Sequence, residues 1–204
     1  MRLLPLCLLL CLLSACNRHQ SALPEPSTAI DTSLLRDGDL IFRLGRGLES
    51  HAVTVADKRA TYSHTGLLVH QQEGWKVLHA VPGESEETEG KEVIKQDAIS
   101  LFLRSDRCIK ACVMRYDTNV EARALLRQEA LRLHGKALLF DHSYDKTDST
   151  KMYCTEYVCH VYQAIGVDLA EGRCHRFPMA KEPVIYPLDL RCNKRLTTVW
   201  SSEK

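Results

Sequence analysis

The sequence lacks a strong imbalance of charge. It has 27 Lys and Arg against 26 Asp and Glu, a formal net charge of +1. Proteins that bind nucleic acid or anionic membrane surfaces through charge carry a clear excess or patch of basic residues. A charge-driven partner, nucleic acid above all, is therefore not expected.

Several motifs of well-known sites are missing as well. The chain has no Gly-rich phosphate-binding loop and no Gly-x-Ser-x-Gly turn. It has neither a CxxC pair nor an HxxxH pair, the spacings typical of zinc sites. No internal repeat is visible. No metal or other cofactor is therefore predicted.

What the chain does have at its start is a leader. The first residues, MRLLPLCLLLCLLSAC, combine one arginine, a Leu-rich run too short to span a bilayer, and small residues before a cysteine. The ending LSAC resembles the lipobox of bacterial lipoproteins, in which the cysteine becomes an acylated N-terminus. Residues 1–15 are therefore predicted to be a signal peptide and Cys16 a lipid anchor, with an ordinary cleaved signal peptide as the alternative.

The rest of the chain is organised as a tether and one domain. Residues 16–33 are polar and contain two prolines, so they predict a flexible tether. Residues 34–204 have the length and composition of a single domain. Asn17 resembles the residue found after the cysteine in lipoproteins sent to the outer membrane, so the expected location is the bacterial envelope, at the outer membrane facing the periplasm.

Cysteine spacing leaves disulfide pairing open. Beyond Cys16, the mature chain would keep six cysteines: Cys108, Cys112, Cys154, Cys159, Cys174 and Cys192. A domain of this size does not need disulfides. Cys108 and Cys112 flank a predicted strand, where they would stand about 13 Å apart, beyond the roughly 7 Å that a disulfide spans.

Apolar runs predict strands in the first half of the domain. They lie near residues 39–43, in HTGLLVH and WKVLHA around a turn at Gln72 and Glu73, in KEVIK, and in CIKACVMRY. Helical spacing then predicts a helix over 120–134, with a capping box formed by Thr118 and Glu121, and a second helix from Cys154 to Gly166. The Pro-containing tail is expected to be extended surface structure.

Cys154 is the candidate nucleophile among the cysteines. A thiol at a helix N-terminus faces free N–H groups and the positive end of the helix dipole, which stabilise a thiolate and could hold an oxyanion. Cys159 lies inside the same helix and is expected to pack in the core. Thiolate catalysis also needs a base and a group that orients it. The hairpin register brings residues near 66 and 79 opposite each other, so His64 and His79 are expected at the same end of the sheet.

Five segments, in this order, resemble a known family. RDGDLIF, YSHTGLLV, VLHAVPG, HGKALLFDHSYD and YCTEYVCHVY are similar to the YiiX/YaeF-like permuted papain-like amidases, relatives of the NlpC-type cell-wall hydrolases. The resemblance covers roughly residues 35–166. It implies a circularly permuted papain-like α+β fold, an antiparallel sheet packed against helices, with the catalytic cysteine at a helix N-terminus.

The resemblance also implies roles for single residues. Cys154 matches the nucleophile, His64 the base and His79 the third, polar residue, a position that is often Glu in this family. The resemblance extends to Asp141 and Tyr144, although Asp141 fits turn capping slightly better. Glu156 is either a substrate-contacting or bracing residue or a favourable charge at the helix start.

Other interpretations of the same residues are open. Cys154, His64 and His79 could be core residues, or could coordinate zinc with one open position. The predicted function is a lipid-anchored cysteine amidase or peptidase that acts on peptides, amino-acid amides or peptidoglycan fragments. A lipid acyltransferase or thioesterase and a non-catalytic envelope binding lipoprotein are the alternatives.

Overall fold

A six-stranded antiparallel sheet forms the centre of the computed structural model, which describes residues 29–84, 91–177 and 180–203. The strand order is β4-β3-β2-β1-β5-β8, and every neighbouring pair is antiparallel. The strands are β1 (Leu40–Gly45), β2 (His64–Gln71), β3 (Gly74–His79), β4 (Lys95–Ala98), β5 (Cys108–Tyr116) and β8 (Leu196–Ser201).

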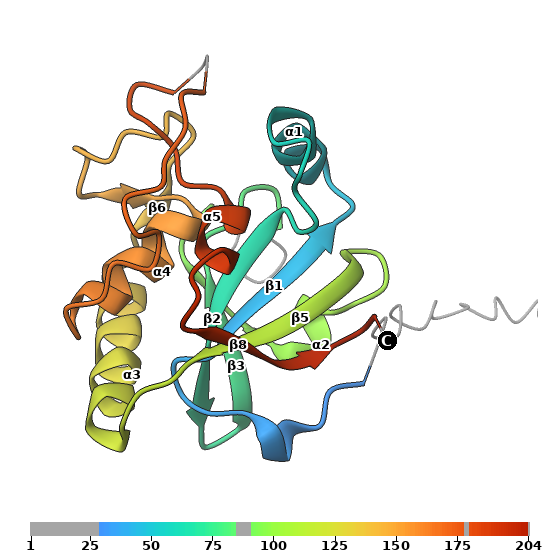
Figure 1. Ribbon diagram of the computed structural model, residues 1–204, viewed down its shortest axis with the longest axis vertical. Helices are drawn as coiled ribbons and strands as arrows, with labels where there is room; N and C mark the ends of the chain where they lie inside the picture. The colour runs from blue at the N-terminus through green and yellow to red at the C-terminus, as the bar shows by residue number, and fades with distance from the viewer. Residues whose placement is uncertain (1–28, 85–90, 178–179, 204) are drawn as a thin grey trace, which may run out of the picture.

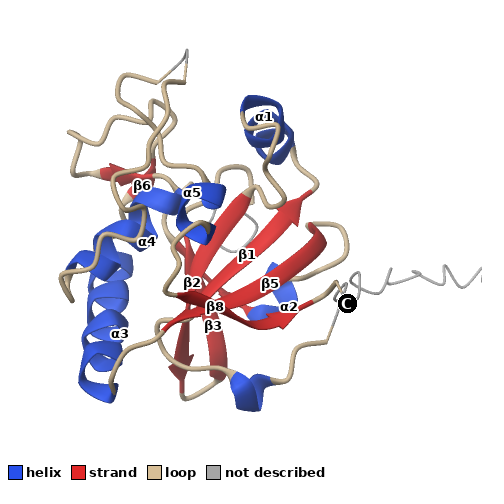
Figure 2. Cartoon of the chain, viewed as in Figure 1, coloured by secondary structure: helices blue, strands red, loops and turns tan. Residues whose placement is uncertain are grey.

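Helices cover the sheet unequally. They are α1 (Leu48–Ala56), α2 (Ile99–Phe102), α3 (Val120–Gly135), α4 (Cys154–Gln163) and α5 (Pro187–Arg191), with a 3-10 turn η1 (Thr32–Leu34). The two longer helices that pack together, α3 and α4, lie on one side of the sheet (Figure 1). The helix α1 stands beyond the end of β1, apart from α3 and α4 (Figure 2). A short parallel pair, β6 (Leu139–Phe140) and β7 (Lys151–Met152), precedes α4.

Strand alternation builds a core on each face of the sheet. Leu40 and Phe42 of β1 belong to the larger cluster, which includes side chains of α3 and α4. Ile41, between them, belongs to a smaller cluster with Phe102 of α2. Side chains of successive strand residues point to opposite faces, so an apolar run such as LIF fits a strand covered on both sides. The predicted α+β architecture is confirmed.

Some predicted boundaries are wrong. The strand expected in KEVIK begins only at Lys95. The N-cap of α3 is Asn119, whose side chain accepts the Ala122 N–H at 2.8 Å, so the capping box of Thr118 and Glu121 does not form. An asparagine oxygen satisfies a first-turn N–H as well as a threonine hydroxyl does.

The C-terminal tail differs most from its prediction. Pro187 opens α5, because proline suits the first position of a helix, and β8 then pairs with β5. The tail therefore completes the sheet instead of running over the surface. No helix within the described ranges is both long and apolar enough to cross a bilayer. Cys16 and most of the predicted tether lie outside those ranges.

Candidate active site

Cys154 is the first residue of α4, as predicted. The preceding Tyr153 is extended, so the helix starts sharply and the thiol lies among backbone N–H groups of Thr65, Thr155 and Cys154 itself. Burial raises the pKa of the Cys154 thiol to about 11, although these N–H groups and the charge of Arg43 act to lower it. The resting group is therefore a neutral thiol.

The two histidines meet at the end of the β2–β3 hairpin. Leu67 pairs with Leu78, which is the register that the turn at Gln72 and Glu73 predicts. His64 Nε2 lies 2.9 Å from His79 Nδ1, so the rings share a hydrogen bond. Because β2 also supplies the Thr65 N–H to the Cys154 sulfur, this hairpin end lies against the start of α4.

Asp97 extends this pair, and the sequence interpretation missed it. Its Oδ2 lies 3.1 Å from His79 Nε2, and both side chains are buried. On β4, Asp97 pairs with Val77 and Lys95 pairs with His79. Asp97 is two residues from Lys95, so it lies on the same face of the sheet as His79. Ending the predicted strand at Lys95 excluded Asp97. The sequence feature that could have indicated Asp97 is the alternation of side chains along a strand, which puts Lys95 and Asp97 on the same face as His79.

Burial keeps both histidines neutral. It lowers the pKa of His64 well below its usual value, and the charge of Arg43 lowers it further. It also lowers the pKa of His79, against the opposing hydrogen bond and charge of Asp97. Near neutral pH the site therefore holds a thiol and two uncharged imidazoles.

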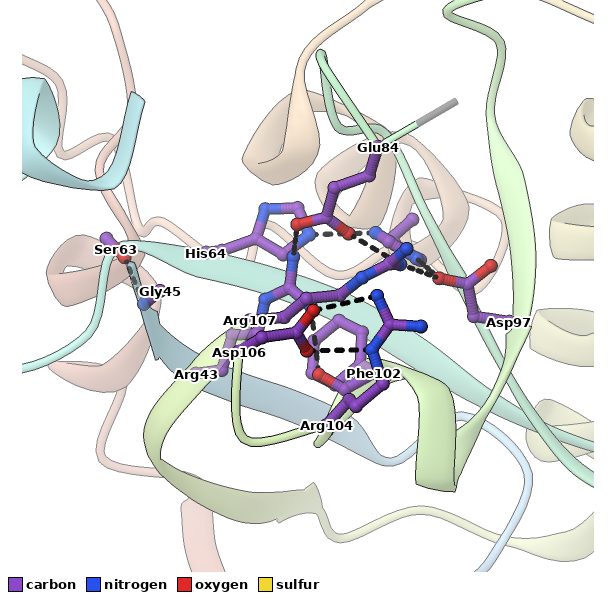
Figure 3. Close-up of polar contacts among 11 residues, drawn as sticks. Arg43, Gly45, Ser63, His64, Glu84, Asp97, Phe102, Arg104, Asp106 and Arg107 are labelled. Atoms are coloured by element: carbon purple, nitrogen blue, oxygen red, sulfur yellow. Dashed lines mark hydrogen bonds and ion pairs between the residues drawn. The ribbon is translucent and has the colours of Figure 1, made fainter. Parts of the chain in front are cut away.

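Arg43 is a second residue that the sequence did not indicate. It pairs with His64 across β1 and β2 and is almost fully buried. Its guanidinium donates to the Phe102 carbonyl at 2.9 Å, lies over the Phe102 ring and forms an ion pair with Glu84 (Figure 3). The carboxylate, the carbonyl and the ring replace part of the hydration of this buried arginine, whose Nε has no hydrogen-bond partner within the described ranges.

A cavity of about 270 Å³ opens beside Cys154 and His64. Its apolar lining comes from α1 and from the segments after β3 and before α5, and includes Val53, Val81, Phe177, Val184 and Ile185. Its charged lining includes Arg46, Arg104, Arg107, Glu84 and Asp106. The cavity can thus hold a ligand with both an apolar and a polar part.

The three supporting candidates have different places. Tyr144 lines the cavity near Cys154. Burial raises the pKa of the Tyr144 hydroxyl to about 12, and a thiolate at Cys154 also acts to raise it. Asp141 does not line the cavity. It is fully buried and accepts the Ser143 N–H at 2.9 Å and the Asp145 N–H, which is the expected turn capping and orders the loop that carries Tyr144.

Glu156 is a bracing residue at the helix start. Its carboxylate accepts the Tyr153 N–H at 3.3 Å, and it is not among the residues that line the cavity. Burial raises its pKa to about 7. Of the alternatives for Glu156, a substrate-contacting or bracing residue or a favourable charge at the helix start, the contact with the Tyr153 N–H fits a bracing residue.

The remaining cysteines contribute no further site. Cys159 packs in the larger core cluster, as predicted. All six cysteines from Cys108 to Cys192 are free thiols. Within the described ranges, no three His, Cys, Asp or Glu side chains are grouped as metal ligands, so the zinc interpretation of Cys154, His64 and His79 has no geometric support.

The fold is a permuted papain-like fold, in which the histidine strands precede the cysteine helix. The chain belongs to the permuted papain-like amidase family, YaeF/YiiX, C92, which residues 34–200 match. A crystal structure titled metalloprotein YiiX, from Escherichia coli O157:H7, is 26% identical with a TM-score of 0.65, over 81% of this chain and 96% of that chain. No curated protein matches the chain.

Proposed function

We propose that this chain is a cysteine amidase or peptidase in which Cys154 is the nucleophile, His64 the general base and His79 the residue that orients His64. The observation that carries the proposal is the hydrogen-bonded pair of His64 and His79, 2.9 Å apart, at the cavity that the Cys154 thiol lines. The substrates are peptides, amino-acid amides or peptidoglycan-derived fragments.

The neutral site dictates the order of proton transfers. His64 takes the thiol proton as the sulfur bonds to the carbonyl carbon, since the raised pKa of Cys154 leaves little free thiolate. The carbonyl oxygen becomes an oxyanion, for which first-turn N–H groups and the Tyr144 hydroxyl are donors. The C–N bond then breaks as His64 gives its proton to the leaving amine. Water, deprotonated by His64, hydrolyses the thioester and restores the thiol.

A thiol-labelling experiment tests this assignment. The mature protein is treated with iodoacetamide near neutral pH and its labelled cysteines are mapped, with His64→Ala as comparison. His64 can take the proton of the neutral Cys154 thiol as the sulfur attacks the reagent, so we expect Cys154 to react faster than the exposed Cys174 and Cys192, and His64→Ala to remove that advantage. A Cys154 that reacts no faster than these two would contradict catalysis and support the binding lipoprotein.

A second candidate function rests on the apolar lining of the cavity. Val53, Phe177 and Ile185 could hold an acyl chain, so a lipid acyltransferase or thioesterase would use the same thiol. Hydrolysis of a panel of short peptide amides and of long-chain acyl thioesters, each compared with Cys154→Ala, separates the two. Faster turnover of the thioesters would replace the amide proposal.

We also propose that Cys16 carries a lipid that anchors the protein in the outer membrane, facing the periplasm. The support is the leader and its LSAC ending. Cells fed an alkyne-labelled fatty acid should label the wild-type protein and Cys7→Ser, but not Cys16→Ser. Membrane fractionation of the same cells gives the location. Labelling of Cys16→Ser would contradict the anchor.

A further inference from the structure

Asp97 is a buried carboxylate to which the proposed reaction gives no role. It is about 1% exposed, and its Oδ2 lies 3.1 Å from His79 Nε2 and 3.5 Å from Arg107 Nη1. Burial raises the pKa of Asp97, but the hydrogen bond from His79 and the charges of Lys95 and Arg107 outweigh it and lower the pKa. Asp97 is therefore an anion, and an ionised carboxylate can only accept hydrogen bonds.

The charge of Asp97, together with the neutrality of both imidazoles, determines which nitrogen of each histidine carries the proton. Because Asp97 accepts, the His79 nitrogen that faces it, Nε2, carries the proton. His79 is neutral, so its Nδ1 is bare and must accept the hydrogen bond from His64 Nε2. His64 is neutral too, and its one proton is on Nε2. The lone pair of His64 Nδ1 is then free to take a proton.

We propose that Asp97 is a positioning residue that sets the tautomers of His79 and His64, so that His64 presents a bare Nδ1 as the base. This role rests on the proposed function only for its catalytic consequence. When His64 takes the proton, it becomes a cation whose Nε2–H bond to His79 strengthens. The negative charge of Asp97 polarises His79, and the polarised His79 stabilises the His64 cation more than a neutral imidazole without that carboxylate would.

A chain of charged groups holds Asp97 in place. Arg107 Nη1 lies 3.2 Å from Glu84 Oε2, and the other Glu84 oxygen pairs with Arg43, the neighbour of His64 on β1. Figure 3 shows Arg107 between Asp97 and Glu84, with Arg43 below them. Arg107 thus lies at the same Asp97 oxygen, Oδ2, as His79, and the two contacts together limit the freedom of the carboxylate to turn away.

The variant that tests the proposal is Asp97→Asn in the mature protein. An amide can donate to His79 Nε2, which would put the His79 proton on Nδ1 and the His64 proton on its base nitrogen. We expect kcat to fall on the order of 100-fold or more with little change in KM. Two-bond ¹H–¹⁵N spectra should show both imidazoles in the opposite tautomers, and iodoacetamide labelling of Cys154 should slow.

Asp39→Asn is the matched control. Asp39 is equally buried and pairs with Arg115 at 2.6 Å, but it is at the other end of β1 and contacts neither histidine. We expect a comparable loss of thermal stability, with kcat and both tautomers unchanged. If Asp39→Asn lowers kcat as much as Asp97→Asn does, the effect is one of stability and the proposal fails.

If Asp97→Asn does not fold, the two-bond ¹H–¹⁵N spectra of the wild-type protein still test the proposal. The proposal requires both His64 and His79 as Nε2–H tautomers, and a proton on His64 Nδ1 would overturn it. This result is independent of catalysis. If Cys154→Ala keeps its amidase activity, the proposed function fails while the tautomer assignment can still be correct.

Discussion

At the scale of single residues, Gly66 controls how closely the histidine strands approach. It lies opposite His79, and a Cβ added there would be 2.7 Å from Val77 Cγ1, 2.9 Å from His79 Cβ and 3.0 Å from the Leu78 oxygen. Gly66→Ala must push β3 away. We expect a loss of about 1–3 kcal/mol of stability and, because His79 moves, most of the activity.

Gly135→Ala is the control for this prediction. Gly135 is the last residue of α3, and an added Cβ there would meet nothing within 4 Å. We expect unchanged activity and a gain of up to about 1 kcal/mol. Urea unfolding and amide hydrolysis measure both variants. Equal behaviour of the two would show that the close approach at Gly66 is not needed.

The buried, neutral His64 predicts loss of stability in mild acid. The unfolded chain binds a proton as pH falls below 6.5, whereas the folded protein does not, because the pKa of His64 is lowered. The stabilisation is complete above pH 6.5 and is lost below it, at about 1.4 kcal/mol per pH unit at most. His64→Asn should therefore show a shallower decline of unfolding free energy between pH 6.5 and 5. An identical slope in both proteins would contradict a depressed pKa.

At the scale of elements, the first turn of α4 is tied to the segment that leads into α5. The buried Thr155 Oγ1 donates to the Ile185 carbonyl at 2.6 Å, and the Ile185 N–H donates to the Tyr153 hydroxyl at 3.3 Å. Thr155→Val leaves that carbonyl unpaired. We expect a loss of about 1–3 kcal/mol and a higher KM, because Ile185 lines the cavity.

Thr54→Val separates this effect from a general cost of the substitution. The Thr54 hydroxyl of α1 also donates to a backbone carbonyl, that of His51 at 2.9 Å, but this hydrogen bond is exposed. Its loss should change stability by no more than about 0.5 kcal/mol. Thermal unfolding measures the stability of both variants, and Michaelis–Menten kinetics measure their KM. A Thr155→Val enzyme with unchanged KM would remove the link between this contact and the cavity.

Elements with local signals could be predicted, and those with distant partners could not. The β2–β3 hairpin follows from apolar strands around a polar turn, so its register brought His64 and His79 together from sequence alone. Arg43 was missed because a charged side chain inside a strand usually faces solvent, and its partner Glu84 is 41 residues away. The same holds for β8, whose partner β5 lies some eighty residues earlier in the chain.

At the scale of the whole molecule, the C-terminal strand closes one edge of the sheet. β8 pairs with β5 along Cys112–Tyr116, buries Leu196 in the larger core cluster and packs Val199 and Trp200 against the smaller one. Removing residues 195–204 would expose the β5 edge and apolar surface of both clusters at once. Unpaired edges of this kind recruit other chains.

We therefore expect the truncated protein to aggregate and to lose activity, although every proposed catalytic residue is retained. Deletion of residues 203–204 is the control, since Glu203 contributes an exposed ion pair with Lys110 and an exposed hydrogen bond to Ser201, and exposed ion pairs contribute about 0–1 kcal/mol. Size-exclusion chromatography and thermal unfolding compare the two deletions with the full chain. A monomeric 195–204 deletion with an unchanged melting temperature would mean that the sheet is stable without β8.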